Sequence, residues 1–129
     1  MENDCRREPS EDLLQGIATF NAGEWFECHE ILEELWVGES GEARDLYQGV
    51  LQVAVALHHW REGNYRGAMH LLASGVKLLH HVEPVCQGVD VAALIAAVGQ
   101  VRESLEALGP ERMAELDRQI IPRVSLFGS

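Results

Sequence analysis

Apolar residues recur every three to four positions through most of the chain, which is the spacing of a helix that buries one face. This pattern predicts helices over about residues 11–20, 24–37, 43–62, 65–82 and 90–108, and a short sixth helix over about residues 111–120. Glycine, proline and asparagine separate these segments, and no stretch alternates convincingly as a strand does. We therefore predict an all-α fold, a compact bundle of about five to six helices, mostly antiparallel because the connecting loops are short.

The predicted helices fill a single helical domain, which we assign to residues 1–129. Residues 1–9 are predicted as an N-terminal extension and residues 122–129 as a C-terminal tail. The tail carries Leu126 and Phe127, and apolar side chains at a terminus are seldom left in water. It should therefore pack on its own bundle or on a second copy of the chain, and of the oligomeric states we favour a homodimer.

Charge and composition narrow the function classes. The formal net charge is −11, from 10 basic and 21 acidic residues. Such a surface repels phosphate backbones and anionic lipids, so we expect neither a nucleic-acid partner nor a membrane partner. No apolar run reaches the roughly 20 residues that cross a bilayer, and the N-terminus lacks the apolar segment of a signal peptide. We expect a cytoplasmic protein.

The three cysteines, Cys5, Cys28 and Cys86, are widely spaced along the chain. Their number and spacing suggest neither a disulfide framework nor a zinc knuckle. Cys28 lies beside a histidine and could act as a nucleophile. We favour the simpler interpretation, in which it is a small residue that packs between helices.

The stretch "WFECHEILEELW", Trp25 to Trp36, places polar groups on a predicted helix. At roughly 100° per residue, His29, Glu33 and Trp36 share one face, with Glu30 at its margin. By the same arithmetic Gln48, Gln52 and His59 share a face of the next helix. A short loop joins the two helices, so we predict that His29 and Glu33 meet Gln52 and His59 in one cluster.

Two interpretations of this cluster stay open. In the first, the polar groups satisfy one another and fix the packing of the helices. In the second, imidazole and carboxylate converge in a pocket that binds a divalent metal ion or moves protons. The sequence "HEILE" places His29 and Glu33 at positions i and i+4, a workable but weak signal for metal ligands.

The series "FNAGEWFECHEILEELW" and "YQGVLQVAVALHHWREGNYRGAMHLL" resembles a bacterial and archaeal family known as domain of unknown function 309. The resemblance covers about residues 20–79. It rests on residues of two blocks: Phe20, Asn21, Gly23, Phe26, His29, Glu30, Leu32, Glu33 and Trp36, then Gln48, Gly49, Gln52, Ala54, Ala56, His59, Gly63, Asn64, Gly67 and Ala68. It implies a small all-α domain, and the family carries the label of a predicted metal-dependent hydrolase.

Our leading hypothesis is a pocket between the second and third helices, filled by a small molecule. For an enzyme we expect metal-assisted hydrolysis with one divalent ion, Zn²⁺, Mn²⁺, Ni²⁺ or Mg²⁺. His29, Glu33 and His59 would bind the ion, and Glu30 would be the base. The ligand itself would be bound by Gln48, Gln52 and Trp36.

The alternative is a non-catalytic interaction or ligand-binding module. There Trp25, Trp36 and Trp60 would provide apolar contacts, and the polar cluster would be structural.

Overall fold

The computed structural model of the chain describes residues 4–127, and within that range it is a bundle of five α-helices. The α-helices are α1 (Glu11–Asn21), α2 (Trp25–Val37), α3 (Ala43–Arg61), α4 (Tyr65–His80) and α5 (Val91–Arg112). Short 3₁₀ helices are η1 (Asp4–Arg6), η2 (Met113–Glu115) and η3 (Arg118–Ile120), and two strands are β1 (Val85–Cys86) and β2 (Val89–Asp90). The predicted all-α fold is confirmed. The first three residues of the predicted extension and the last two of the predicted tail lie outside the described residues.

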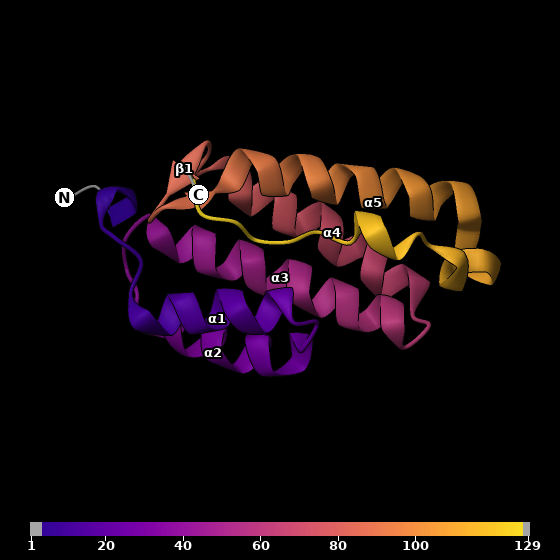
Figure 1. Cartoon of the computed structure of the whole chain (residues 1–129), viewed down its shortest axis with the longest axis horizontal. Coiled ribbons are helices and arrows are strands. Elements are labelled where there is room, and N and C mark those ends of the chain that lie inside the picture. The colour runs from indigo at the N-terminus through magenta and orange to yellow at the C-terminus, as the bar shows by residue number, and fades with distance from the viewer. Residues whose placement is uncertain (1–3, 128–129) are drawn as a thin grey trace.

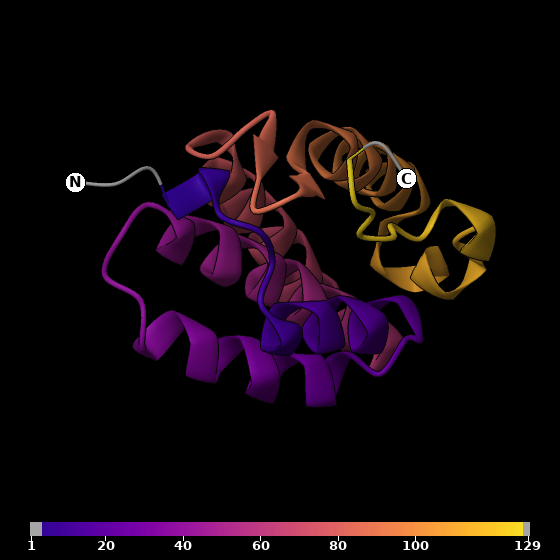
Figure 2. The same cartoon turned by 60° about the vertical axis from the view of Figure 1, so that its left-hand side comes forward.

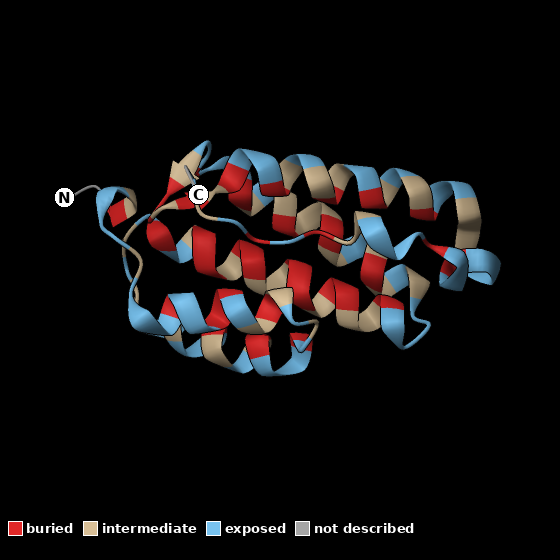
Figure 3. Cartoon of the chain, viewed as in Figure 1, coloured by how far each residue is buried: buried red, intermediate tan, exposed pale blue. Residues whose placement is uncertain are grey.

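Helix α3 lies at the centre of the bundle. It packs against α2 on one side and α4 on the other, while α1 covers α2 and α5 covers α4 (Figures 1 and 2). The buried positions of α3 include Leu46, Val53 and Leu57, which form part of one continuous core (Figure 3). Fully burying one such side chain contributes roughly 1.5–3 kcal/mol, so this helix organises the fold. Nowhere in residues 4–127 is a helix both long and apolar enough to cross a membrane.

Two glycines let α3 and α4 approach closely. A Cβ atom at Gly49 would lie 2.8 Å from Leu79 Cδ2, and one at Gly75 would lie 3.1 Å from the carbonyl oxygen of Gly49. Both distances are shorter than ordinary van der Waals contact. The sequence requirement for glycine here is therefore steric and comes from the packing of the two helices.

The predicted sixth helix, residues 111–120, is wrong. Helix α5 is interrupted at Gly109, which has a φ of 75°, and the chain continues as the separate turns η2 and η3. Leu116 and Asp117 between these turns are extended, and the Asp117 side chain accepts a hydrogen bond from the Gln119 N–H group at 2.9 Å. Asp117 thus starts a new turn where the apolar pattern predicted a continuous helix.

The structure also contains a hairpin that the sequence pattern did not predict. Strands β1 and β2 pair antiparallel around Gln87 and Gly88, whose φ angles are 49° and 78°. Two consecutive residues with positive φ are typical of a two-residue hairpin turn. The Gln-Gly pair was the available signal, weaker than the Asn-Gly pair that usually marks such a turn.

The C-terminal tail packs on its own bundle, which is the first of the two predicted alternatives. Val124 is buried, and its N–H and C=O groups both bond to the Asn21 side chain, at 2.8 and 2.9 Å. Further along, Leu126 bridges to Val89 beside the hairpin. Figure 1 shows the tail running back along the length of the bundle towards the hairpin. The homodimer stays a prediction.

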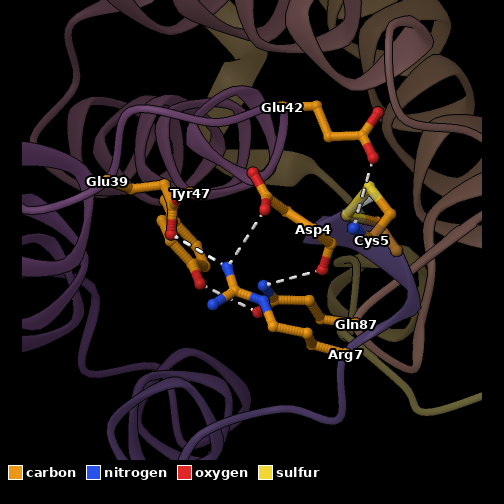
Figure 4. The surroundings of a disulfide bond; sticks show 8 residues. Asp4, Cys5, Arg7, Glu39, Glu42, Tyr47 and Gln87 are labelled. Atoms are coloured by element: carbon orange, nitrogen blue, oxygen red, sulfur yellow. Dashed lines mark hydrogen bonds and ion pairs between the residues drawn. A yellow bond between two sulfur atoms is a disulfide. The ribbon is translucent and has the colours of Figure 1, made fainter. Parts of the chain in front are cut away.

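Cys5 and Cys86 form a disulfide bond, which corrects the expectation that the cysteines build no such link. The bond joins η1 to β1 across a sequence separation of 81 residues (Figure 4). The Gln87 N–H group donates to the Cys5 carbonyl at 2.7 Å, and the Tyr47 hydroxyl donates to Gln87 Oε1 at 2.8 Å. The sequence could not reveal this pairing, because only the hairpin brings Cys86 to the N-terminal segment.

Candidate functional site

A small pocket lies between α2 and α3, close to where the sequence predicts that polar residues meet. Its volume is about 160 Å³, and it is lined by Trp25, Phe26 and His29 of α2 and by Val55 and His58 of α3. We call this the α2–α3 pocket. Four of its five lining side chains are aromatic or imidazole rings, so its surface is mainly apolar.

The rings of the pocket wall lie near one another and are tilted rather than parallel. The Phe26 ring centroid is 6.4 Å from that of His29 and 6.2 Å from that of His58, with interplanar angles of 31° and 46°. The Phe26 side chain is 56% exposed, which is high for a phenylalanine. The pocket therefore opens to solvent beside an exposed aromatic residue.

Neither imidazole is held by a polar partner at its Nδ1 atom. The Nδ1 atoms of His29 and His58 are buried, and neither has a hydrogen-bond partner within residues 4–127. A histidine that ligates a metal almost always uses its second ring nitrogen to bond a carboxylate, a carbonyl group or water. Such a supporting bond is missing for both histidines in the described part of the chain.

The carboxylates predicted for the site lie at its exposed margin. His29 Nε2 lies 3.9 Å from Glu33 Oε1, and the Glu33 side chain is 52% exposed. Glu30 is also exposed. An ion pair this long between partly exposed groups contributes little, typically below about 1 kcal/mol.

The predicted meeting of His29 with His59 and Gln52 is wrong. His59 and Gln52 do share a face of α3, but that face contacts α4. His59 Nδ1 accepts a hydrogen bond from Asn64 Nδ2 at 3.2 Å, and Gln52 Oε1 accepts one from the Ser74 hydroxyl. The rotation of α3 about its axis is the physical reason, since it turns the neighbouring residue, His58, towards α2.

The two remaining predicted ligand-binding residues, Gln48 and Trp36, are half-buried and do not line the α2–α3 pocket. The Arg44 guanidinium covers the Trp36 ring at 4.5 Å from its centroid. Trp36 thus has a cation–π partner in the exposed Arg44, outside the lining of the pocket.

The described side chains do not fit the predicted metal site. Within residues 4–127 no group of three or more His, Cys, Asp and Glu side chains is placed to hold an ion. Of the predicted ligands only His29 and Glu33 are near each other, whereas His59 is engaged with the loop before α4. Metal binding therefore stays a prediction that this arrangement does not favour.

Cys28 has the environment of a packing residue. It is fully buried, and its Sγ donates to the Gly16 carbonyl oxygen at 3.4 Å. Burial raises the pKa of the thiol from 9.0 to about 12. The reactive thiolate is thus strongly disfavoured at neutral pH, which supports the packing interpretation over the nucleophile.

Comparison with known proteins finds a family model that matches part of the chain. Residues 13–71 match the model of DUF309, a domain of unknown function. This confirms the resemblance seen in the sequence. The DUF309 segment extends from α1 into α4 and contains every residue of the α2–α3 pocket.

Two curated relatives are similar to this chain. The uncharacterized protein YpuF of Bacillus subtilis (strain 168) is 36% identical over 88 residues, which are 66% of this chain and 51% of the relative. An uncharacterized protein of Aquifex aeolicus (strain VF5) is 25% identical over 105 residues, 81% of this chain and 32% of that relative. The chain thus spans about half the length of the first relative and about a third of the second.

Proposed function

We propose that this chain is a non-catalytic binding module that holds one aromatic ring of a small molecule in the α2–α3 pocket. The size and lining of the pocket carry this proposal. An apolar cavity of roughly 150 Å³ accommodates a benzene molecule, and the α2–α3 pocket has a volume of about 160 Å³. Aromatic rings pack favourably against other rings edge to face or offset, and four rings are available in its wall.

The position of the carboxylates supports binding over catalysis. No carboxylate of the described residues lines the pocket, and the two candidates, Glu30 and Glu33, are exposed. A general base must lie within hydrogen-bond reach of the proton that it removes. The pocket can hold a ring by apolar contact, and its lining gives the two imidazoles, those of His29 and His58, no carboxylate to act as a paired acid or base.

A titration with p-cresol tests the proposal. We expect amide chemical shifts in the NMR spectrum to move around Trp25, His29 and His58. Replacing Val55 with phenylalanine should fill the pocket and abolish these shifts. Val37→Phe is the matched control, because Val37 is 70% exposed on α2 and does not line the pocket.

Two outcomes would contradict the binding module. The first is a spectrum that p-cresol leaves unchanged, and the second is equal binding by wild type and by a folded Val55→Phe variant. Folding of each variant is checked by circular dichroism and thermal melting.

The metal-dependent hydrolase is the second candidate, motivated by the pair His29 and Glu33 and by the family label. A thermal-shift screen with Zn²⁺, Mn²⁺, Ni²⁺ and Mg²⁺ tests it on protein without a histidine tag. An ion that binds only the folded state, at 100 times its dissociation constant, adds about 2.7 kcal/mol of stability. We expect no such gain. A gain that His29→Gln and His59→Gln both abolish would favour the hydrolase instead.

A further inference from the structure

A second cavity lies at the end of the bundle where α3 ends. Its volume is about 380 Å³, and it is formed by the turn after α1, the start of α2, the end of α3, and the segment from η3 into the tail. Three arginines, Arg61, Arg118 and Arg123, line it. We call it the arginine cavity. It therefore collects three of the ten basic residues of a chain whose net charge is −11.

Carboxylates do not neutralise these arginines. The lining of the arginine cavity contains no Asp or Glu among the described residues. Within residues 4–127, the guanidinium groups of Arg7 and Arg112 form ion pairs with carboxylates, whereas the three guanidinium groups of the arginine cavity form none. In a protein with 21 acidic residues, three arginines that converge without a counter-charge are an unusual arrangement.

Uncharged partners hold each guanidinium in place instead. Arg61 Nη1 donates to the Gly23 carbonyl at 2.8 Å, and its guanidinium covers the Trp25 ring at 4.5 Å from the centroid. The Arg118 guanidinium lies 5.3 Å from the centroid of the Trp60 ring. These contacts orient the guanidinium groups and leave most of their N–H groups free, since each group has five.

Arg123 completes the set from the tail. Its Nη1 donates to the Asn21 carbonyl at 3.4 Å, next to the two hydrogen bonds that the Asn21 side chain makes to Val124. The tail therefore brings a third cation to the cavity and is itself tied to the end of α1. The apolar part of the lining includes Phe20 and Ile121, against which carbon atoms of a ligand can pack.

We propose that the arginine cavity binds a small organic molecule through a multivalent oxyanion group, a phosphate ester or a set of carboxylates. Planar guanidinium groups match such oxygens in bidentate geometry, and charge-assisted hydrogen bonds are the strong ones. A volume of about 380 Å³ lies within the range of roughly 300–1,000 Å³ that is usual for small-ligand sites. This site is a different cavity from the α2–α3 pocket, with which it shares only the Trp25 side chain among the lining residues, and it extends beyond the DUF309 segment through Arg118 and Arg123.

Isothermal titration at constant ionic strength tests the proposal with two probes that lack an aromatic ring. Glycerol 3-phosphate represents phosphate esters, citrate represents polycarboxylates, and glycerol is the uncharged control. We expect saturable binding of at least one anion and none of glycerol. The anion that binds shows whether the cavity takes phosphate esters or polycarboxylates. Changes in the NMR chemical shifts of amides around Gly23, Arg61 and Gln119 locate the bound anion.

Charge-removing variants decide whether the arginines act as proposed. Arg118→Gln and Arg123→Gln should each weaken anion binding by about tenfold to a hundredfold, the effect of losing one hydrogen bond to a charged group. Both side chains are exposed, so these variants should fold. Arg6→Gln removes the same charge from η1, near the other end of the bundle (Figure 1), and should leave binding unchanged.

Three results would overturn the site. They are an absence of saturable binding for both anions, an equal loss in Arg6→Gln, and full binding retained by both folded cavity variants. Since neither anion carries an aromatic ring, a negative result here leaves the p-cresol experiment on the α2–α3 pocket unaffected.

Discussion

The disulfide between Cys5 and Cys86 gives the most quantitative prediction for this chain. The bond ties η1 to the hairpin, so breaking it releases the N-terminal segment from covalent attachment to the bundle (Figure 4). Reduction changes the unfolded state most, because the unfolded chain gains the freedom that a closed loop denies it. We expect Cys5→Ser and reduced wild type to be destabilised by similar amounts.

The sequence separation sets the magnitude. For a loop closed across 81 residues, the chain-entropy relation gives about 4.5 kcal/mol at 25 °C. Measured values for disulfides are typically about 2–4 kcal/mol, because the unfolded state retains some structure. The hydrogen bonds of Gln87 with Cys5 and Tyr47 can persist without the disulfide, so they add nothing to the free energy that is lost when the disulfide is broken. The expected loss is therefore roughly 2–4.5 kcal/mol.

Urea unfolding with and without dithiothreitol measures this loss. With a slope of about 1–3 kcal/mol per molar urea, the midpoint of the wild type should fall by about 1 M or more on reduction. The reductant should leave the midpoint of Cys5→Ser unchanged, because that variant has no bond to break. Thiol counting in denaturant without reductant should find one free thiol in the wild type, that of Cys28.

A midpoint that does not respond to the reductant would refute the reasoning on loop entropy. Three free thiols in the unreduced, denatured wild type would refute the pairing itself. The two measurements separate a bond that contributes little from a bond that is not formed.

Two further perturbations test the packing of the bundle. Gly49→Ala places a methyl group 2.8 Å from Leu79 Cδ2, so overpacking of about 1–3 kcal/mol should outweigh the helix-propensity gain of about 1 kcal/mol and lower the melting temperature. Gly99→Ala in α5 is the control, because its Cβ meets nothing within 4 Å, and this change should raise the melting temperature. Burial raises the pKa of Cys28 to about 12, so the folded protein keeps a proton that the unfolded chain releases above pH 9. Stability should therefore fall as the pH rises from 9 to 12, and urea midpoints of Cys28→Ala should fall less over that window.

The sequence predicted the helices well because their signals are local. The apolar spacing and the glycine breaks placed α2 and α3 within one residue of their observed ends. The prediction of a sixth helix was wrong because Asp117 starts a new turn. A capping residue inside an apolar pattern is hard to distinguish from an ordinary surface residue. The hairpin was not predicted because its strands have two residues each, which is too few to show the alternation of apolar and polar residues that marks a strand.

The sequence predicted a polar site between α2 and α3, whereas the pocket that lies between these helices is mainly apolar and shares only His29 with the predicted residues. Sequence arithmetic fixes which residues share a face of α3, but not which face turns towards α2. A rotation of about 100° exchanges His58 for His59, and the two adjacent histidines gave no basis for choosing. The arginine cavity could not be predicted from the sequence for a different reason. Arg61 and Arg123 line the same cavity only because the tail folds back along the bundle.

The two proposed sites share one side chain, and this leads to a last prediction. Trp25 lines both the α2–α3 pocket and the arginine cavity, with Arg61 over its face and Trp60 at 6.5 Å. Its indole Nε1 is buried without a hydrogen-bond partner in the described residues, so nearby ring and guanidinium contacts hold the indole where a polar bond does not. A ligand that orders this ring in one site should reduce the entropic cost of binding in the other.

We therefore expect p-cresol to bind more tightly in the presence of whichever anion binds. Thermodynamic linkage requires the anion affinity to rise by the same factor when p-cresol is saturating. Titrations of each ligand with and without the other measure both factors. Trp25→Phe, which keeps an aromatic ring but changes its size and contacts, should alter the factor, whereas Trp36→Phe should not, since Trp36 lines neither site. Affinities that are independent of the second ligand would show that Trp25 is a rigid wall between the sites and transmits nothing.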